Sequence, residues 1–249
     1  MKCIVLAAGY ATRLYPLTEN YPKPLLEISG KTILDWLLED IDSTSDIQEY
    51  AVVSNHKYAE HFFKWAKGLR LKAQVKVIDD GSVSNETRLG AVKDIQFAVD
   101  SVGADDDLLV IAGDNLLDFS LAGFIDYFNK KQSTCVMRFF EPDTARCSRS
   151  GVVEIDESDK IISMEEKPET PRSNWCAPPF YIYRKEDIPL IQRAIKEGCE
   201  TDAPGNFIAW LCRQTEVYAM EMPGKRYDIG NMESYRHAQE KYKGVVWTA

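Results

Sequence analysis

The first half of the chain alternates short apolar runs with segments of helical periodicity, and this alternation limits the fold more than any other feature. Cys3–Leu6, Ala51–Val53 and Leu108–Ala112 are continuously apolar, as expected of strands that are buried on both faces of a sheet. Thr32–Ile41 carries its apolar residues at helical spacing, and Leu89–Val99 is also expected to be a helix. This order predicts right-handed βαβ crossovers and a mainly parallel sheet.

The pattern changes after Ser133, where short strand candidates follow one another with few helices between them. The strand candidates are Thr134–Phe139, Gly151–Ile155, Ile161–Met164, Phe180–Tyr183 and Val217–Met222, and the helix candidates are Ile188–Lys196 and Asn206–Gln214. We therefore predict a Rossmann-like, three-layer α/β/α fold with a mainly parallel central sheet and a mixed second half. Residues 1–249 would form a single domain, with one half at about 1–132 and the other at about 133–249.

Composition and charge exclude several classes of protein. The chain has 39 acidic and 30 basic residues, and its formal net charge of −9 argues against a general polyanion binder such as a nucleic-acid coat protein. The apolar run at the N-terminus is too short for a secretion signal, and no later run approaches the length of a membrane span. The six cysteines form no C-x-x-C pair, and the three histidines share no metal-ligand spacing. We expect a soluble cytoplasmic protein without nucleic-acid or membrane partners, and a homo-oligomer is compatible with this expectation.

The segment that follows the first strand has the composition of a phosphate-binding turn. In Leu6–Leu14, small residues let backbone N–H groups approach a phosphate, and Arg13 supplies a planar cation. Lys23 follows between Pro22 and Pro24, which restrict the backbone around it. The spacing matches neither G-x-G-x-x-G nor a Walker A loop, so a dinucleotide site is not indicated.

These elements, in their order along the chain, resemble the bacterial sugar-1-phosphate nucleotidyltransferases, such as glucose-1-phosphate thymidylyltransferase and its uridylyl, cytidylyl and guanylyl relatives. The family opens with L-A-A-G-x-G-T-R-L-x-P-L-T and continues with P-K-P, and this chain departs from it at Ala11, where alanine replaces the second glycine and tolerates positive φ poorly. Gly113-Asp114-Asn115 and Tyr227-Asp228-Ile229-Gly230 resemble the two elements in which the family carries its magnesium-binding aspartates.

The resemblance implies a Mg²⁺-dependent enzyme that transfers a nucleoside monophosphate from a nucleoside triphosphate (NTP) to a sugar 1-phosphate and releases pyrophosphate. It implies Arg13 and Lys23 as catalytic residues and Asp114 and Asp228 as metal ligands. The implied nucleotide-binding residues are Leu6, Ala8, Gly9, Tyr10, Ala11, Thr12, Asn85 and Thr87, the last replacing a glycine usual in the base-reading segment. The implied acceptor-binding residues, mostly in the second half, are Asn115, Gly151, Glu166, Lys167 and Pro179.

The segment Ala177–Tyr181 is the clearest departure from the family and leaves the acceptor open. Many members have a small residue and a glycine there, whereas Pro179 and Phe180 narrow or reshape the space. A phosphocholine-type cytidylyltransferase is an alternative, because Trp175, Phe180, Tyr181 and Glu166 could enclose a trimethylammonium group. An inactive regulatory homologue is a weaker alternative, since both cations and both aspartates are present. No left-handed β-helix acyltransferase segment follows, so we do not expect a bifunctional enzyme.

Overall fold

The computed structural model describes residues 1–44, 47–103 and 105–246. The chain divides into two compact units, each built from separate stretches of sequence. The first unit comprises Met1–Arg88, Ala112–Gly123 and Pro223–Ala249, and the second comprises Leu89–Ile111 and Phe124–Met222. The single domain with halves near residue 132 stays a prediction.

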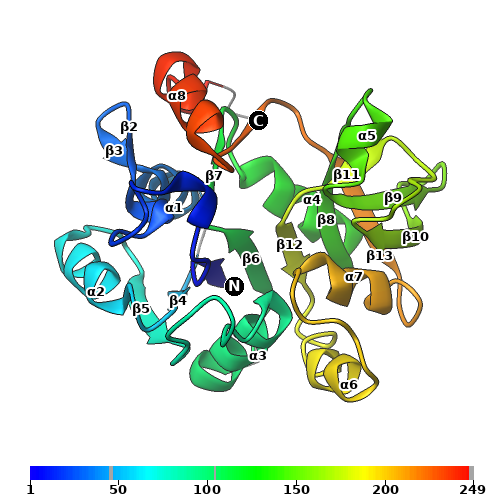
Figure 1. Cartoon of the computed structure of the whole chain (residues 1–249). Helices are drawn as coiled ribbons and strands as arrows, with labels where there is room; N and C mark the ends of the chain where they lie inside the picture. Colours follow the sequence, from blue (N-terminus) through cyan, green and yellow to red (C-terminus); the bar gives the residue numbers. More distant parts are fainter. Residues whose placement is uncertain (45–46, 104, 247–249) are drawn as a thin grey trace. The chain divides into compact units, whose positions relative to one another are not determined.

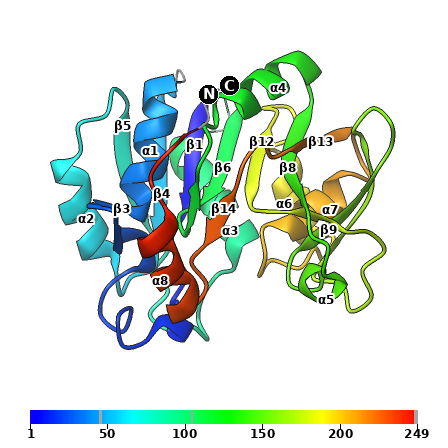
Figure 2. The ribbon, with the colours of Figure 1, turned by 90° about the horizontal axis from the view of Figure 1, so that it is seen from above.

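The first unit contains the parallel strands that the sequence predicts. Strands β1 (Lys2–Leu6), β4 (Glu49–Ser54) and β5 (Gln74–Asp79) pair in parallel, with β4 in the middle. Helices α1 (Ile33–Thr44) and α2 (Ala59–Gly68) connect them in turn, and α2 packs against β5 (Figures 1 and 2). The central residues of β1 are fully buried, as a strand covered on both faces requires.

Helix α1 shows how the local sequence sets an element boundary. Thr32 Oγ1 accepts a hydrogen bond from Asp35 N at 3.0 Å, and Asp35 Oδ2 accepts one from Thr32 N at 3.1 Å. This reciprocal pair satisfies backbone donors that the first turn leaves free. Leu34, Leu38 and Ile41 then lie on the buried face, as their helical spacing predicts.

Shorter elements of the first unit carry the segments of functional interest. They are the 3₁₀ helices η1 (Thr12–Leu14) and η2 (Lys23–Leu25), the strands β2 (Glu27–Ile28), β3 (Lys31–Thr32), β7 (Asn115–Leu117) and β14 (Arg226–Asp228), and helix α8 (Met232–Lys241). Strand β14 pairs antiparallel with β7, so Asp228 lies opposite Asn115. One apolar cluster that includes Leu14, Ile33, Leu116 and Ile229 fixes these segments to each other.

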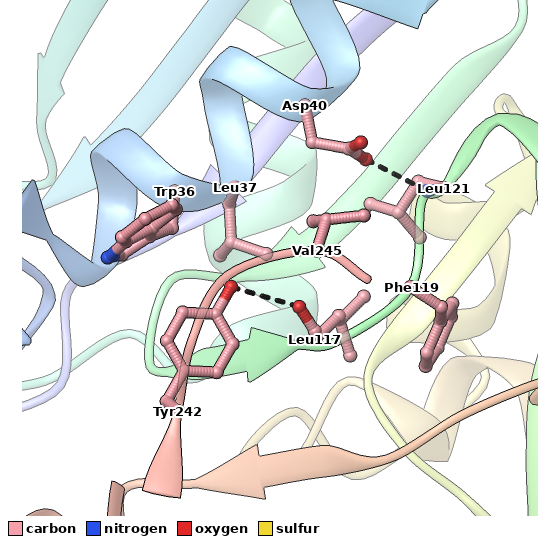
Figure 3. Close-up of a pocket in the computed structure, with 8 residues that line it drawn as sticks. All are labelled: Trp36, Leu37, Asp40, Leu117, Phe119, Leu121, Tyr242 and Val245. Atoms are coloured by element: carbon pink, nitrogen blue, oxygen red, sulfur yellow. Dashed lines mark hydrogen bonds between the residues drawn. The ribbon is translucent and has the colours of Figure 1, made fainter. Parts of the chain in front are cut away.

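A small pocket of the first unit lies between α1 and the end of the chain (Figure 3). Its lining is mostly apolar, with Trp36, Leu37 and Tyr242 on one side, and Asp40 supplies a carboxylate that accepts a hydrogen bond from Leu121 N at 2.9 Å. Burial raises the pKa of Asp40, and the Leu121 N–H lowers it by less. The pocket therefore contains a carboxylate whose ionised form is disfavoured.

The second unit contains the mixed sheet that the sequence predicts after Ser133. Its strands lie in the order β10-β9-β11-β8-β12-β6, and these neighbours pair antiparallel, whereas β13 pairs with β8 in parallel. The strands are β6 (Leu108–Ala112), β8 (Thr134–Phe140), β9 (Gly151–Ile155), β10 (Ile161–Glu166), β11 (Trp175–Ala177), β12 (Phe180–Tyr183) and β13 (Val217–Glu221). The helices are α3 (Ala91–Val102), α4 (Ala122–Lys131), α5 (Thr144–Cys147), α6 (Leu190–Lys196) and α7 (Gly205–Leu211). Helix α7 packs against β10.

The prediction of an α/β fold, with a parallel first part and a mixed second part flanked by helices, is confirmed. Within the described ranges, no helix combines the length and the apolar character needed to cross a lipid bilayer.

Candidate active site

The loop after β1 is held in place through its carbonyl oxygens. Asn55 Nδ2 donates to Ala8 O at 2.9 Å, and Thr18 Oγ1 donates to Ala11 O at 2.7 Å. The Tyr10 side chain also anchors the loop, because it is buried and its hydroxyl donates to Ser82 O at 2.9 Å. The backbone N–H groups of residues 9–11 donate to no acceptor in the part of the chain that the structure describes. They are therefore available to an anion such as a phosphate.

Ala11 adopts the conformation that the family's glycine would favour. Its φ of 48° and ψ of 41° lie in the left-handed region, immediately before η1. Leu14 then enters the apolar cluster, while Thr12 and Arg13 stay exposed. The Arg13 guanidinium makes no ion pair or hydrogen bond with the described residues. The alanine at position 11 thus adopts the left-handed turn conformation expected of the family's glycine. The exposed Arg13 guanidinium is accessible to a ligand.

Lys23 is bonded directly to the first predicted metal ligand. Its Nζ lies 2.5 Å from Asp114 Oδ2 and donates to Ile229 O at 2.9 Å. Pro22 and Pro24 flank Lys23. Gly113, which has no side chain, allows its segment to approach both β1 and Pro24 closely. A Cβ at Gly113 would lie 3.1 Å from Val5 Cγ1 and 3.4 Å from Pro24 Cγ. The sequence elements L-A-A-G, P-K-P and G-D-N therefore meet in one place.

Both carboxylate oxygens of Asp114 have a partner. Asn115 Nδ2 donates to Asp114 Oδ1 at 2.6 Å, while Lys23 binds Oδ2. Burial raises the pKa of Asp114, but the charge and hydrogen bond of Lys23, together with the charge of Arg226, overcome this and hold the pKa below its ordinary value. The side chain keeps 32% of its surface exposed, so a further cation can still reach the carboxylate.

Asp228, the second predicted metal ligand, lies beside Asp114 along the backbone. Ile229 N donates to Asp114 O at 3.2 Å, and Asp228 faces Asn115 across β7 and β14. The Asp228 side chain is 54% exposed, and Arg226 Nη1 lies 3.4 Å from its Oδ2. Carboxylate oxygens are the hard donors that Mg²⁺ prefers. Two carboxylates from adjacent segments are enough to hold this ion, because it keeps several water ligands. The described residues contain no group of three or more His, Cys, Asp or Glu side chains that would form a fuller metal cage.

Arg226 is a site residue that the sequence reasoning missed. Its Nη1 donates to Asn115 Oδ1 at 2.6 Å, so both ends of the buried Asn115 amide are used. Its position could have been inferred, because residues two apart on a strand share a face and Arg226 precedes Asp228 by two. Asn115 thus links Arg226 to Asp114, and its predicted contact with an acceptor stays a prediction.

The predicted base-reading residues lie on an exposed turn after β5. Thr87 Oγ1 accepts hydrogen bonds from Ser84 N at 3.1 Å and Val83 N at 3.2 Å. Asn85 Oδ1 accepts one from Arg88 Nη1 at 2.8 Å. The threonine that replaces the family's glycine therefore shapes the turn through its own side chain. The base contacts of Asn85 and Thr87 stay a prediction.

The second unit brings together four of the predicted acceptor-binding residues. Gly151 pairs with Glu166 across β9 and β10, and Lys167 N donates to Ser150 O at 3.0 Å. A Cβ at Gly151 would lie 3.0 Å from Glu166 Oε2 and 3.5 Å from Ala177 O, two residues before Pro179. Gly205, at the start of α7, also lies against Glu166 and was not found from the sequence.

Comparison with known proteins agrees with this geometry. Residues 2–244 match the family model described as nucleotidyl transferase, so the chain belongs to that family. The resemblance to the sugar-1-phosphate nucleotidyltransferases is confirmed.

Two relatives and one solved structure illustrate the similarity. The bifunctional protein GlmU of Methanocaldococcus jannaschii is 32% identical over 236 residues, which cover 92% of this chain and 51% of the relative. The UTP–glucose-1-phosphate uridylyltransferase AglF of Haloferax volcanii is 26% identical over 252 residues, which cover 97% of this chain and 96% of AglF. A crystal structure of UDP-glucose pyrophosphorylase with UDP-glucose has the same fold, with a TM-score of 0.81 at 21% identity and 97% coverage of both chains. The chain spans about half the length of several curated relatives that it matches.

Proposed function

We propose that this protein is a Mg²⁺-dependent nucleotidyltransferase that joins the nucleoside monophosphate of an NTP to a sugar 1-phosphate. An oxygen of the acceptor phosphate attacks the α-phosphorus, the bond to the β-phosphate oxygen breaks, and pyrophosphate leaves with the electron pair. No enzyme nucleophile is required. The products are an NDP-sugar and pyrophosphate.

The observation that carries this proposal is the convergence of Lys23, Asp114 and Asp228 beside the turn that contains Arg13. The reaction brings two anions together, so its main requirement is the neutralisation of charge. A magnesium ion held by Asp114 and Asp228 would supply positive charge to the phosphates and lower the cost of their approach. Arg13 is exposed and unpaired among the described residues, which suits a role on the pyrophosphate. Lys23 is assigned to the α-phosphate and the acceptor phosphate.

The first unit is assigned to the nucleotide and the second to the acceptor's non-phosphate part. Free backbone N–H groups at residues 9–11 suit triphosphate oxygens. The cluster of Gly151, Glu166 and Ala177 contains no cation of its own apart from Lys167, which is exposed next to it. Acceptor discrimination is therefore assigned to that cluster and to Pro179.

The contacts of Trp175 disfavour the phosphocholine alternative. A trimethylammonium group is bound by open aromatic faces. The Trp175 ring is already covered by the Arg138 guanidinium, 4.6 Å from its centroid, and touches Phe140 edge-on at 5.3 Å. Phe180 and Tyr181 are buried, with 0% and 1% exposure. These aromatic side chains do not form an open cage around Glu166.

The proposal is tested by measuring pyrophosphate release with four triphosphates against a panel of sugar 1-phosphates and phosphocholine, with and without Mg²⁺. We expect release with at least one sugar 1-phosphate, only with Mg²⁺, and in equal amount to the NDP-sugar formed. Release with phosphocholine alone would favour the cytidylyltransferase alternative. An absence of release with every acceptor would contradict the proposed function.

A further inference from the structure

The segment Lys57–Lys76, which contains helix α2, concentrates positive charge in a chain that is acidic as a whole. It has six Lys or Arg residues and one acidic residue, Glu60. The rest of the chain has 24 basic and 38 acidic residues. The net charge of −9 therefore conceals one strongly basic segment.

Helix α2 presents part of this charge on one exposed face. Its exposed side chains are Glu60, Phe63, Lys64 and Lys67, which follow the i, i+3, i+4, i+7 spacing of a single helical stripe. Phe62 points the other way and is fully buried, and α2 packs beside β5 (Figure 1). The stripe thus brings two cations to the solvent together with Phe63, which is 39% exposed.

The charge continues beyond the end of α2. Arg70 and Lys72 are both exposed on the segment that connects α2 to β5. We call Phe63, Lys64, Lys67, Arg70 and Lys72 the α2 basic face. None of its four cations forms an ion pair with a residue that the structure describes. Attraction to the carboxyl end of the helix can account for Lys67, but this effect is confined to the last turn and leaves Arg70 and Lys72 unexplained.

The acidic side chains of α1 nearest to this segment are used for other contacts. Asp35 Oδ1 accepts a hydrogen bond from the indole Trp65 Nε1 at 2.8 Å. Asp42 is buried, and its Oδ2 accepts one from the backbone Lys72 N at 2.9 Å. The four cations of the α2 basic face therefore repel each other without a compensating carboxylate, and an anionic partner would relieve this repulsion.

The α2 basic face does not belong to the candidate active site. Strands β1, β4 and β5 run parallel, so their carboxyl ends lie at one edge of the sheet. The phosphate-binding turn at residues 9–11 follows the carboxyl end of β1, whereas Arg70 and Lys72 precede the amino end of β5. The cations at the end of α2 therefore lie toward the opposite edge, and they suit an anion other than the substrates.

We propose that the α2 basic face binds the protein peripherally to a membrane surface that contains anionic lipids. The face is convex and its cations are spread along a helix and a loop, which suits an extended anionic surface better than one small anion. Lys and Arg side chains are attracted to anionic headgroups, and an exposed aromatic ring such as that of Phe63 inserts at the boundary with the acyl chains.

Peripheral binding of this kind requires no spanning helix. The expectation of no membrane partner depended on the lack of a spanning segment, and the local charge of α2 leads to a different conclusion. A single nucleic-acid strand is the less favoured occupant, because binding without sequence preference uses successive stacking aromatics, and Phe63 is the one aromatic residue on the exposed stripe of α2.

The test is co-sedimentation of the full chain with vesicles of phosphatidylcholine alone or with about 30 mol% phosphatidylglycerol, an anionic lipid. We expect binding to the anionic vesicles at about 0.1 M salt, much weaker binding at about 0.5 M salt because the charges are screened, and little binding to neutral vesicles. Fluorescence anisotropy with a labelled single-stranded oligonucleotide, in the same buffers, measures the nucleic-acid alternative.

The double variant Lys64→Gln/Lys67→Gln should bind the anionic vesicles about tenfold or more weakly, since each cation near an anionic surface contributes about fivefold. Lys130→Gln/Lys196→Gln is the matched control, because it removes two exposed lysines from the last turns of α4 and α6 and changes the net charge equally. The control should bind like the wild type. Circular dichroism checks that both double variants are folded.

Three results would overturn the inference. They are equal binding of the wild type to neutral and anionic vesicles, an equal loss of binding in the two double variants, and tighter binding to the oligonucleotide than to the anionic vesicles. The proposed function is unaffected by any of them, because pyrophosphate release is measured without vesicles.

Discussion

Lys23 and Asp114 form a direct ion pair, with Lys23 Nζ 2.5 Å from Asp114 Oδ2, although 91 residues separate them in the sequence. The ammonium therefore occupies an oxygen that a magnesium ion would use. The second oxygen of Asp114 is held by Asn115, which is fixed in turn by Arg226. A magnesium ion bound at Asp114, as the proposed function has it, would compete with the Lys23 ammonium for this carboxylate, and displacement of Lys23 from Oδ2 would free its charge for the phosphates.

A first prediction follows from this competition. Lys23→Gln should bind Mn²⁺ about tenfold more tightly than the wild type in the absence of nucleotide, because the competing charge at Asp114 is gone. The same variant should lose about a hundredfold in turnover, on the order of 3 kcal/mol, because Lys23 no longer reaches the transferred phosphate. The free Mn²⁺ signal in electron paramagnetic resonance measures the affinity.

Lys31→Gln is the control for that experiment, since Lys31 is exposed and pairs with Glu39 away from Asp114. It changes the net charge of the chain equally and should leave Mn²⁺ binding unaltered. Weaker Mn²⁺ binding by Lys23→Gln than by the wild type would show that Lys23 supports the metal site and does not compete with the metal.

Arg226 gives a second prediction, because its removal leaves the buried Asn115 Oδ1 without a donor. Arg226→Met should lower the free energy of unfolding by about 1–3 kcal/mol, the cost of an unpaired buried acceptor. Lys225→Met, one residue earlier and exposed, is the control and should change stability little. Urea denaturation measures both variants, and equal stabilities would mean that Arg226 does not hold Asn115.

Ala11 gives a third prediction, because it is a non-glycine residue with φ of 48°. Ala11→Gly should raise the free energy of unfolding by about 0.5–1 kcal/mol, since relief of left-handed strain exceeds the extra freedom of glycine in the unfolded chain. Ala11→Val should lower it by about 1 kcal/mol or more, because a β-branched residue tolerates this region poorly. The opposite order in thermal or urea denaturation would contradict the local geometry.

The sequence predicted those parts of the fold that depend on local pattern. The apolar runs at β1, β4 and β6 and the helical spacing in α1 gave elements within a few residues of those observed. The strands β7 and β14 have three residues each, which is too short for periodicity to register. Their pairing brings together distant parts of the sequence. Arg226 and Asn115, which form a hydrogen bond, are 111 residues apart.

Contacts between segments that are far apart in the sequence also limited what could be predicted about the site. Arg13, Lys23, Asp114 and Asp228 could be proposed because each lies in a recognisable element. The contact of Gly205 with Glu166 could not, because a glycine before a short helix has no signal of its own, and its role arises only when α7 packs against β10. Ala11 was recognised from the sequence as a departure from the family's motif. That this alanine still adopts the left-handed conformation became known only from the φ in the structure.

Asp40 gives a prediction on pH, because burial raises the pKa of its carboxyl group in the folded chain. A raised folded pKa means that the folded state holds this proton more tightly, so the contribution of Asp40 to stability falls as pH rises through the folded pKa. Asp40→Asn can still accept the Leu121 N–H bond and does not titrate. The stability of this variant relative to the wild type should therefore increase from pH 4 to pH 7. A difference that is constant with pH would contradict the raised pKa.

The role of the two aspartates is tested most directly by Mg²⁺-dependent pyrophosphate release in Asp114→Asn and Asp228→Asn, measured against the wild type with the preferred NTP and sugar 1-phosphate. Each change removes one anionic oxygen from the proposed metal site and keeps the size of the side chain. We predict that both variants remain folded by circular dichroism and lose at least about a hundredfold in turnover, the scale of a transition-state charge contact. Mg²⁺-dependent turnover within a few-fold of the wild type in either variant would contradict the assignment of these aspartates as the metal ligands.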